Sequence, residues 1–245
     1  MKILTPTYWS RRRVLCTVFC SSAMLGLNVN RASGAGRDAA AGERHWLAIG
    51  DFGSQEQPQV AVAHGMMAYQ QTLSAKPEAL LLLGDNFYKR TENWSVTSPR
   101  WKTGIEDMYP QEAFACPMPA VLGNHDYHDN PGGEQVQLDY AKKEGTRWHL
   151  PAKWYRMDAG GTTPLVTFLF LDTNLRSISG GRLGVVRLLN SLTKEEEQAQ
   201  LEWFKAELAK PRAPWTIVVG HHPVFSNGSH GDSKELVERY APLMQ

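Results

Sequence analysis

The 245-residue sequence has little cysteine, no long apolar run and no basic segment in its main part. Two of its three cysteines, Cys16 and Cys20, lie near the N-terminus, so without that segment only Cys116 remains and no internal disulfide bond can form. The apolar segment from Val14 to Leu27 falls short of the roughly 20 apolar residues that span a bilayer. We therefore expect no stable membrane anchor, and we expect Cys116 to be packed.

The formal net charge of +1 hides an uneven distribution. Residues 1–38 hold six of the 26 basic side chains and one of the 25 acidic ones, which leaves 20 basic and 24 acidic side chains, a net charge of −4, in residues 39–245. A nucleic-acid-binding body needs a concentrated positive charge, so we expect no nucleic-acid partner. A hydrophobic content of 42% is enough to fill the core of one large domain.

The N-terminal segment, residues 1–38, has the order of features that is typical of an export signal. Three arginines (Arg11, Arg12 and Arg13) precede the apolar segment, and small residues follow it. The stretch SRRRVLC also resembles a bacterial twin-arginine signal, although Val14 stands where that pattern prefers Phe. An ordinary secretory signal is the alternative. Either reading predicts a periplasmic or secreted protein with its domain in residues 39–245.

Four apolar runs each end in a glycine followed by a side chain that can bind a metal ion. The runs are WLAIGD, ALLLLGD, PAVLGNH and TIVVGHH, and the side chains that follow the glycines are Asp51, Asp85, Asn124 and His221. Short apolar runs separated by helical stretches predict an α/β fold with a largely buried sheet, in which ligands bind beyond the carboxyl ends of the strands. We therefore expect these four side chains to meet at one edge.

The donor types indicate which metals such a site would bind. Carboxylate, amide and imidazole donors without thiolate suit Fe, Mn, Zn or Mg better than a structural zinc site. Asp85 lies on the second of the runs, between the others, and is the natural carboxylate to bridge two cations. Two metal ions about 3.5–4 Å apart form the clamp that hydrolyses phosphate esters.

These motifs carry a resemblance to a known family. GDFG, GDNFY, GNHDY and GHHPV, in this order, resemble the motifs of the calcineurin-like metallophosphoesterases, and more closely those of the small, tartrate-resistant type of purple acid phosphatase. The resemblance runs from about His45 to Gln245 and implies an α/β sandwich of two sheets flanked by helices. The superfamily begins with Asp-x-His, but Gly53 stands at that histidine here. In purple acid phosphatases a tyrosine three residues after the bridging aspartate compensates, and Tyr88 has that spacing.

The resemblance implies a role for each matching residue. It places Asp51, Asp85 and Tyr88 on Fe(III), and Asp85, Asn124 and His221 on a divalent ion such as Zn, Mn or Fe(II). It makes His125 and His230 the catalytic residues that hold the phosphate or protonate the leaving group. The implied activity is hydrolysis of phosphate monoesters in acid by a metal-bound hydroxide. The expected substrates are small phosphate esters or phosphoproteins.

Two other functions stay open at this point. The first is a phosphodiesterase or nucleotidase of the same superfamily. The second is a non-catalytic exported binding protein or a decayed homologue. The sequence contains no Gly-His-x-His motif after GHHPV, so we expect a C-terminally truncated domain that is short of one imidazole per metal and nearly inactive. A natural variant that completes its metals with water, His222 or His230 is the competing interpretation.

The remaining expectations concern packing and support. The pattern predicts a helix over residues 57–75 with Val62, Met66, Tyr69 and Leu73 on one face. Thr193, followed three residues later by Glu196, predicts a capped helix whose buried stripe is Leu201, Phe204 and Leu208. We expect Asp172 to be a hydrogen-bonding support, and His128 to be a loop residue.

Overall fold

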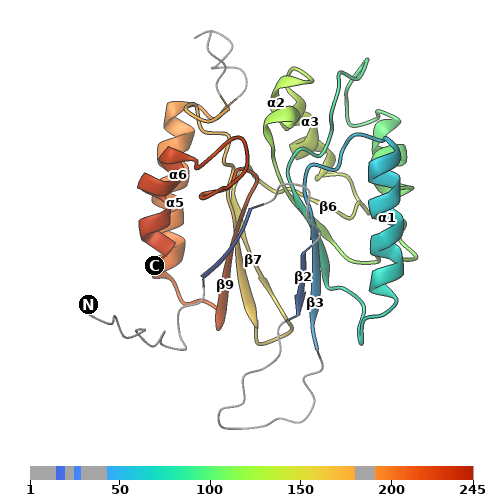
Figure 1. Cartoon of the computed structure of the whole chain (residues 1–245), viewed down its shortest axis with the longest axis horizontal. Coiled ribbons are helices and arrows are strands. Elements are labelled where there is room, and N and C mark those ends of the chain that lie inside the picture. The colour runs from blue at the N-terminus through green and yellow to red at the C-terminus, as the bar shows by residue number, and fades with distance from the viewer. Residues whose placement is uncertain (1–14, 20–24, 29–42, 180–190, 245) are drawn as a thin grey trace, which may run out of the picture.

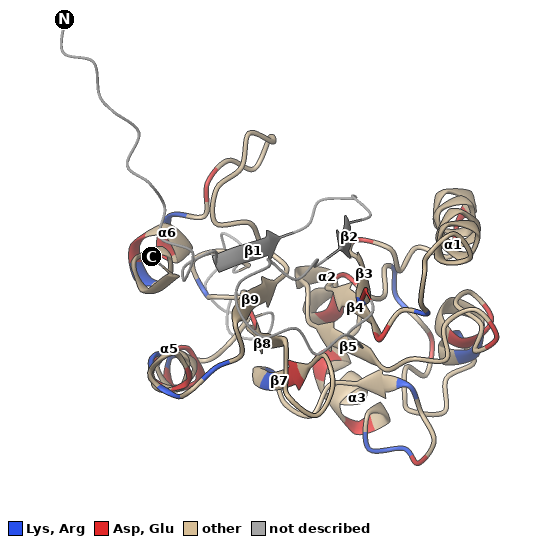
Figure 2. Ribbon diagram, turned by 90° about the horizontal axis from the view of Figure 1, so that it is seen from below, with Lys and Arg blue, Asp and Glu red and all other residues tan. Residues whose placement is uncertain are grey.

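The computed structural model describes residues 43–179 and 191–244, and also the backbone of residues 15–19 and 25–28. Its strands form two sheets that face each other, with helices on their outer sides (Figure 1). Figure 2 views the layers from below and shows α1 on one side and α5 and α6 on the other. This arrangement confirms the predicted α/β sandwich.

The five-stranded sheet has the order β2-β3-β4-β5-β6. Neighbouring strands from β3 to β6 are parallel, and β2 is antiparallel to β3. Because parallel strands end on the same side, the segments that follow β3, β4 and β5 emerge at one edge of the sheet. The strands are β2 (Leu25–Asn28), β3 (His45–Ile49), β4 (Ala79–Leu83), β5 (Met118–Val121) and β6 (Trp148–His149).

The four-stranded sheet has the order β1-β9-β8-β7. β9 is parallel to β8 and to β1, and β7 is antiparallel to β8. The strands are β1 (Leu15–Phe19), β7 (Tyr155–Ala159), β8 (Val166–Phe170) and β9 (Trp215–Gly220).

The helices connect and cover these strands. α1 (Gln57–Gln70) lies outside the five-stranded sheet, and α5 (Lys194–Ala209) and α6 (Lys234–Arg239) lie outside the four-stranded one (Figure 1). The short α2 (Asn124–His128) and α3 (Gly133–Tyr140) follow β5. A π-helical turn spans Lys102–Glu106, and a 3₁₀ turn spans Ala241–Met244.

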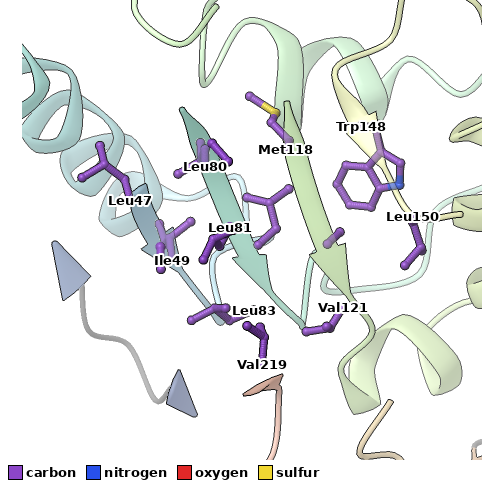
Figure 3. Packing of buried hydrophobic residues seen from close by; sticks show 14 of the residues in the cluster. Leu47, Ile49, Leu80, Leu81, Leu83, Met118, Val121, Trp148, Leu150 and Val219 are labelled. Atoms are coloured by element: carbon purple, nitrogen blue, oxygen red, sulfur yellow. The ribbon is translucent and has the colours of Figure 1, made fainter. Parts of the chain in front are cut away.

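The alternation of side chains along β8 divides the core in two. Phe168 and Phe170 pack toward the five-stranded sheet, whereas Leu169 and Leu171 pack into a second cluster with Phe204 of α5. The period of two residues along a strand produces this division, and each fully buried side chain of this size contributes about 1.5–3 kcal/mol. Figure 3 shows the first cluster, where side chains of β3, β4 and β5 meet Val219 of β9.

Two helix predictions have different outcomes. On α5 the capping box is confirmed, since Thr193 Oγ1 accepts from the Glu196 amide and Glu196 accepts from the Thr193 amide. Leu201 and Phe204 are buried, and Leu208 packs against them. On α1 the predicted face is right for Met66, which is buried, and wrong for Val62 and Tyr69. The buried residues there are Gln59, Ala63 and Met66, whereas Val62 and Tyr69 are exposed and Leu73 lies beyond the helix.

The predicted export signal overlaps β1 and β2, whose backbones pair with β9 and β3. The rest of the predicted segment, residues 1–14, 20–24 and 29–38, lies outside the described residues. The export signal therefore stays a prediction. Among the described residues, no helix has the length and apolar character to cross a membrane.

Candidate metal centre

The segments after β3 and β4 are joined by backbone hydrogen bonds. The Asp51 amide donates to the Gly84 carbonyl over 3.1 Å, and the Gly53 amide donates to the Asp85 carbonyl over 3.2 Å. Asp51 and Asp85 both have left-handed backbones, with φ of 55° and 53°. Residues other than glycine rarely adopt this conformation, and it gathers at functional sites where the surrounding structure enforces it. The two turns therefore present two carboxylates side by side.

Tyr88 completes an oxygen-rich cluster with these aspartates. Its hydroxyl donates to Asp85 Oδ2 over 2.9 Å and lies 3.3 Å from Asp51 Oδ1. Burial, reinforced by the charges of Asp85 and Asp51, raises the pKa of the Tyr88 hydroxyl far above its usual value. In the metal-free chain Tyr88 is therefore a protonated donor, and a bound cation would have to displace that proton.

Gly53 leaves no room for a side chain at the position where the resemblance expects a histidine. A Cβ atom added at Gly53 would lie 2.0 Å from the Asn86 carbonyl oxygen, a distance that no real Cβ contact shows. The Tyr88 amide donates to the Gly53 carbonyl over 3.1 Å, so the two residues are held together. The backbone at Gly53 thus has no room for a side chain, and Tyr88 reaches the cluster instead.

Asn124 and His221 approach from the ends of β5 and β9. His221 Nε2 lies 3.2 Å from Asn124 Oδ1 and 3.4 Å from Asp85 Oδ1. His221 Nδ1 lies 3.0 Å from the Leu83 carbonyl, to which it can only donate, so Nε2 is the nitrogen left for a metal ion. Gly84 makes this approach possible, because a Cβ atom there would lie 2.7 Å from the His221 side chain.

The structure thus brings together all five predicted metal ligands, four of them from the five-stranded sheet and His221 from the other. Ligand atoms of Asp51, Asp85 and His221 lie within 4.8 Å of one another. Asp85 is only 3% exposed, and among the described residues no lysine or arginine forms an ion pair with it; the ring of His221 lies 3.4 Å away instead. A buried carboxylate set beside a second carboxylate and a phenol calls for a compensating cation. The donors therefore fit a centre of hard or borderline metal ions.

Asp126 supports this cluster, and sequence analysis missed it. Its buried carboxylate accepts from the backbone amides of Asn86, Phe87 and Gly123 over 2.8–3.1 Å, and from the Gln137 side chain over 2.9 Å. These bonds fix the segment after β4 to the segment after β5. Burial, with a smaller effect from Asp85, raises the pKa of Asp126 to about 7. The aspartate of GNHDY is visible in the sequence, but no neighbouring residue indicates which amides it accepts from.

His125 lies beside the ligands without being one of the clustered donors. Its amide donates to Asp85 Oδ1 over 2.9 Å, and its ring centroid is 4.4 Å from that of Tyr88. His125 Nδ1 is 3.0 Å from Asp129 Oδ2. The neighbouring His128 ends α2 rather than lying in a loop, which corrects the sequence expectation.

The other predicted residues have varied positions. His230 is exposed on the segment between β9 and α6, and no hydrogen bond joins it to the five candidate ligands within the described part of the chain. His222 Nδ1 is 2.9 Å from the Thr173 hydroxyl, and burial lowers the pKa of His222 to about 3. Asp172 is confirmed as a support, since it accepts from Tyr127 over 2.6 Å and from the Asn174 amide over 2.9 Å. Cys116 is buried and free, as expected.

The fold is an α/β sandwich that carries a cluster of oxygen and nitrogen donors suited to metal ions at the ends of its strands. Residues 46–243 match the calcineurin-like phosphoesterase family, and the chain belongs to it.

Several curated proteins are similar to the chain. Tartrate-resistant acid phosphatase type 5 of Mus musculus is 27% identical over 208 residues, which cover 81% of this chain and 62% of that protein. Purple acid phosphatase 17 of Arabidopsis thaliana is 30% identical over 214 residues, with 83% and 59% covered. The chain thus spans about three-fifths of the length of these relatives.

One solved structure shows the same fold. It is described as "GAP50 the anchor in the inner membrane complex of Plasmodium" and matches with a TM-score of 0.60 and 23% sequence identity. The match covers 81% of this chain and 61% of that one. At this identity the likeness concerns the fold alone.

Proposed function

We propose that the chain carries the centre of an acid phosphatase that hydrolyses phosphate monoesters with Fe(III) and a divalent metal ion. The observation that carries this proposal is the position of Tyr88, whose hydroxyl lies within 3.3 Å of carboxylate oxygens of both Asp51 and Asp85. A phenolate is a hard anionic donor that favours Fe(III). The similarity to tartrate-resistant and purple acid phosphatases supports the same assignment.

The residues divide between two metal positions. Asp51, Asp85 and Tyr88 would hold Fe(III), and Asp85, Asn124 and His221 would hold Zn, Mn or Fe(II), so that Asp85 serves both. When bound, such a pair of ions supplies an activated water and neutralises charge on the phosphoryl group. The chain's own part is to fix the donors: the hydrogen bond from His221 to the Leu83 carbonyl orients the ring, and the amide of His125 holds Asp85 Oδ1.

His125 is the residue that we assign to the substrate. It is half-buried, stacks at an angle on Tyr88 and borders Asp85 without entering the group of clustered donors. From this position an imidazole can hold a phosphate oxygen or give a proton to the leaving alkoxide. His230, exposed on the segment after β9, is proposed as a second substrate-facing histidine. The expected substrates are small phosphate esters or phosphoproteins outside the cytoplasm.

Paired substrates and one variant test the proposal. The purified chain and its His125→Ala variant are compared on a phosphate monoester and the matching diester, with iron and zinc measured in both proteins. The turnover of this chain is expected to be low, but we expect it to favour the monoester over the diester, and to fall by about 10²- to 10⁴-fold in His125→Ala with metal content retained.

Three outcomes would redirect the proposal. A preference for the diester would favour a phosphodiesterase or nucleotidase of the same family. Metal loss in proportion to activity would make His125 a ligand or a structural residue. Iron bound without any turnover would favour the non-catalytic alternative. Whether the chain lacks a C-terminal part stays a prediction.

A further inference from the structure

A second group of metal-ligating side chains lies at the end of α2. It consists of His125, His128 and Asp129, whose donor atoms all lie within 4.8 Å of one another. Asp129 Oδ2 is 3.0 Å from His125 Nδ1, and Asp129 Oδ1 is 2.6 Å from His128 Nδ1. One carboxylate therefore faces two imidazoles, and the resemblance that assigned the first centre gives no role to His128 or Asp129.

The helix brings these three side chains together. Positions i, i+3 and i+4 share one face of a helix, and residues 125, 128 and 129 have this spacing. The Lys89 amide donates to Asp129 Oδ2 and holds the carboxylate in place. The side chains of His125 and His128 are 32% and 34% exposed, so an ion has access from solvent.

The geometry suits a transition-metal ion with an open position. Zinc bonds nitrogen and oxygen donors at about 2.0–2.2 Å, so neighbouring donors in a tetrahedral site lie roughly 3.3 Å apart. Asp129 meets the two imidazoles through different oxygens, at 3.0 Å and 2.6 Å, and one donor atom from each of the three residues lies within 4.8 Å of the others, so small side-chain rotations would bring them around one ion. Two imidazoles and one carboxylate, with water as the fourth ligand, form a donor set found in zinc enzymes. The cation would replace the protons that the imidazoles now share with Asp129.

We propose that His125, His128 and Asp129 form a separate site for a divalent transition-metal ion such as Zn²⁺, and that an ion bound there inhibits the enzyme. The inhibition rests on the proposed function of His125, because an imidazole whose Nδ1 binds a metal ion cannot become the imidazolium that gives a proton to the leaving alkoxide. The binding itself does not rest on that function.

Zinc stoichiometry tests the site directly. Chelator-treated chain is dialysed against increasing Zn²⁺, and bound zinc per folded chain is measured for the wild type, His128→Ala and Asp129→Asn. His64→Ala is the matched control, because His64 is exposed on α1. We expect the wild type and His64→Ala to bind one zinc more than His128→Ala. The Asp129→Asn variant keeps an oxygen that can accept from the Lys89 amide. Removing a group that only hydrogen-bonds to a metal ligand lowers metal affinity by roughly 10- to 100-fold, and we expect the affinity of Asp129→Asn for this zinc ion to fall by at least that much.

Phosphatase activity in excess zinc supplies the second measurement. We expect zinc to inhibit the wild type, and His128→Ala to need at least about tenfold more zinc for half-inhibition. Equal zinc stoichiometry in the wild type and His128→Ala would overturn the proposal and leave Asp129 as a hydrogen-bond partner that orients His125. A chain that takes up the extra zinc but has no phosphatase activity under any metal would support the site and reject the proposed function instead.

Discussion

The two sheets are built from similar apolar strands, but the segments that follow the strands carry different side chains in the two layers. The five-stranded sheet sends Asp51, Asp85 and Asn124 into the candidate centre, and the buried Asp126 fastens these segments to each other. The four-stranded sheet adds one proposed ligand, His221, and its outer side is covered by the apolar packing of α5 and α6. We infer that the geometry of the centre depends on a polar network in one layer, whereas the other layer mainly contributes stability.

Asp126→Ala should have the largest effect, because it removes the acceptor at the centre of the polar network in the five-stranded layer. The substitution leaves the amides of Asn86, Phe87 and Gly123 buried without their acceptor, and each unsatisfied donor costs about 1–3 kcal/mol. We expect the free energy of unfolding to fall by on the order of 5 kcal/mol, and metal binding to be lost. Urea denaturation and metal analysis check both. Asp139→Ala on the surface of α3 is the control, and an equally small effect of both variants would refute the role of Asp126.

Phe204→Ala in the other layer should separate stability from metal binding. Phe204 is fully buried against Tyr240 between α5 and α6, and its removal leaves a cavity that costs about 3–5 kcal/mol. We expect the protein that remains folded to keep its full metal content per chain, because Phe204 is not among the donors of the centre. Metal content that falls in the folded fraction would show that the two layers are coupled.

Glu196→Gln should give the smallest effect, and one that depends on pH. Although burial acts in the opposite direction, the ion pair with Lys153 and the cap at Thr193 lower the pKa of Glu196 in the folded chain. Glu196 therefore stabilises the fold above pH 4.5, and this stabilisation is lost as the pH falls through the lowered pKa. We expect a cost of no more than about 1 kcal/mol at pH 7, because the pair is partly exposed.

Denaturation at pH 7 and pH 3 measures this difference. The difference in unfolding free energy between wild type and Glu196→Gln should narrow from pH 7 to pH 3, while the exposed neighbour Glu195→Gln should differ little from the wild type at either pH. A gap of constant size would mean that the pair with Lys153 contributes no pH-dependent stability.

Sequence patterns predicted which side chains follow the ends of the strands, but they did not predict the hydrogen bonds that hold those segments in place. Apolar runs followed by glycine and a polar donor located Asp51, Asp85, Asn124 and His221, because parallel strands bring their carboxyl ends together. The role of Asp126 was not visible, since its main donors lie on Asn86 and Phe87, about 40 positions away in the sequence. The sequence around Asn86 and Phe87 does not show that their backbone amides need an acceptor from a distant segment.

The error in the predicted buried face of α1 has a related cause. Hydropathy favoured Val62, Met66, Tyr69 and Leu73, but the helix buries Gln59 in place of Val62. Gln59 is satisfied there, because its oxygen accepts from the Gln55 amide over 2.6 Å and its nitrogen donates to the Gly104 carbonyl over 3.3 Å. A polar side chain with both partners can be buried at little cost, and those partners are set by tertiary structure.

The visible spectrum of the iron-loaded chain, read beside its Tyr88→Phe variant, tests the central claim most directly. Phenylalanine keeps the ring against His125 but removes the oxygen next to Asp51 and Asp85. If Tyr88 binds Fe(III) as a phenolate, the wild type is coloured by charge transfer from the phenolate, and Tyr88→Phe loses that band even where iron is retained. A wild-type chain that binds iron without colour, or a Tyr88→Phe variant that keeps the same band, would contradict the account.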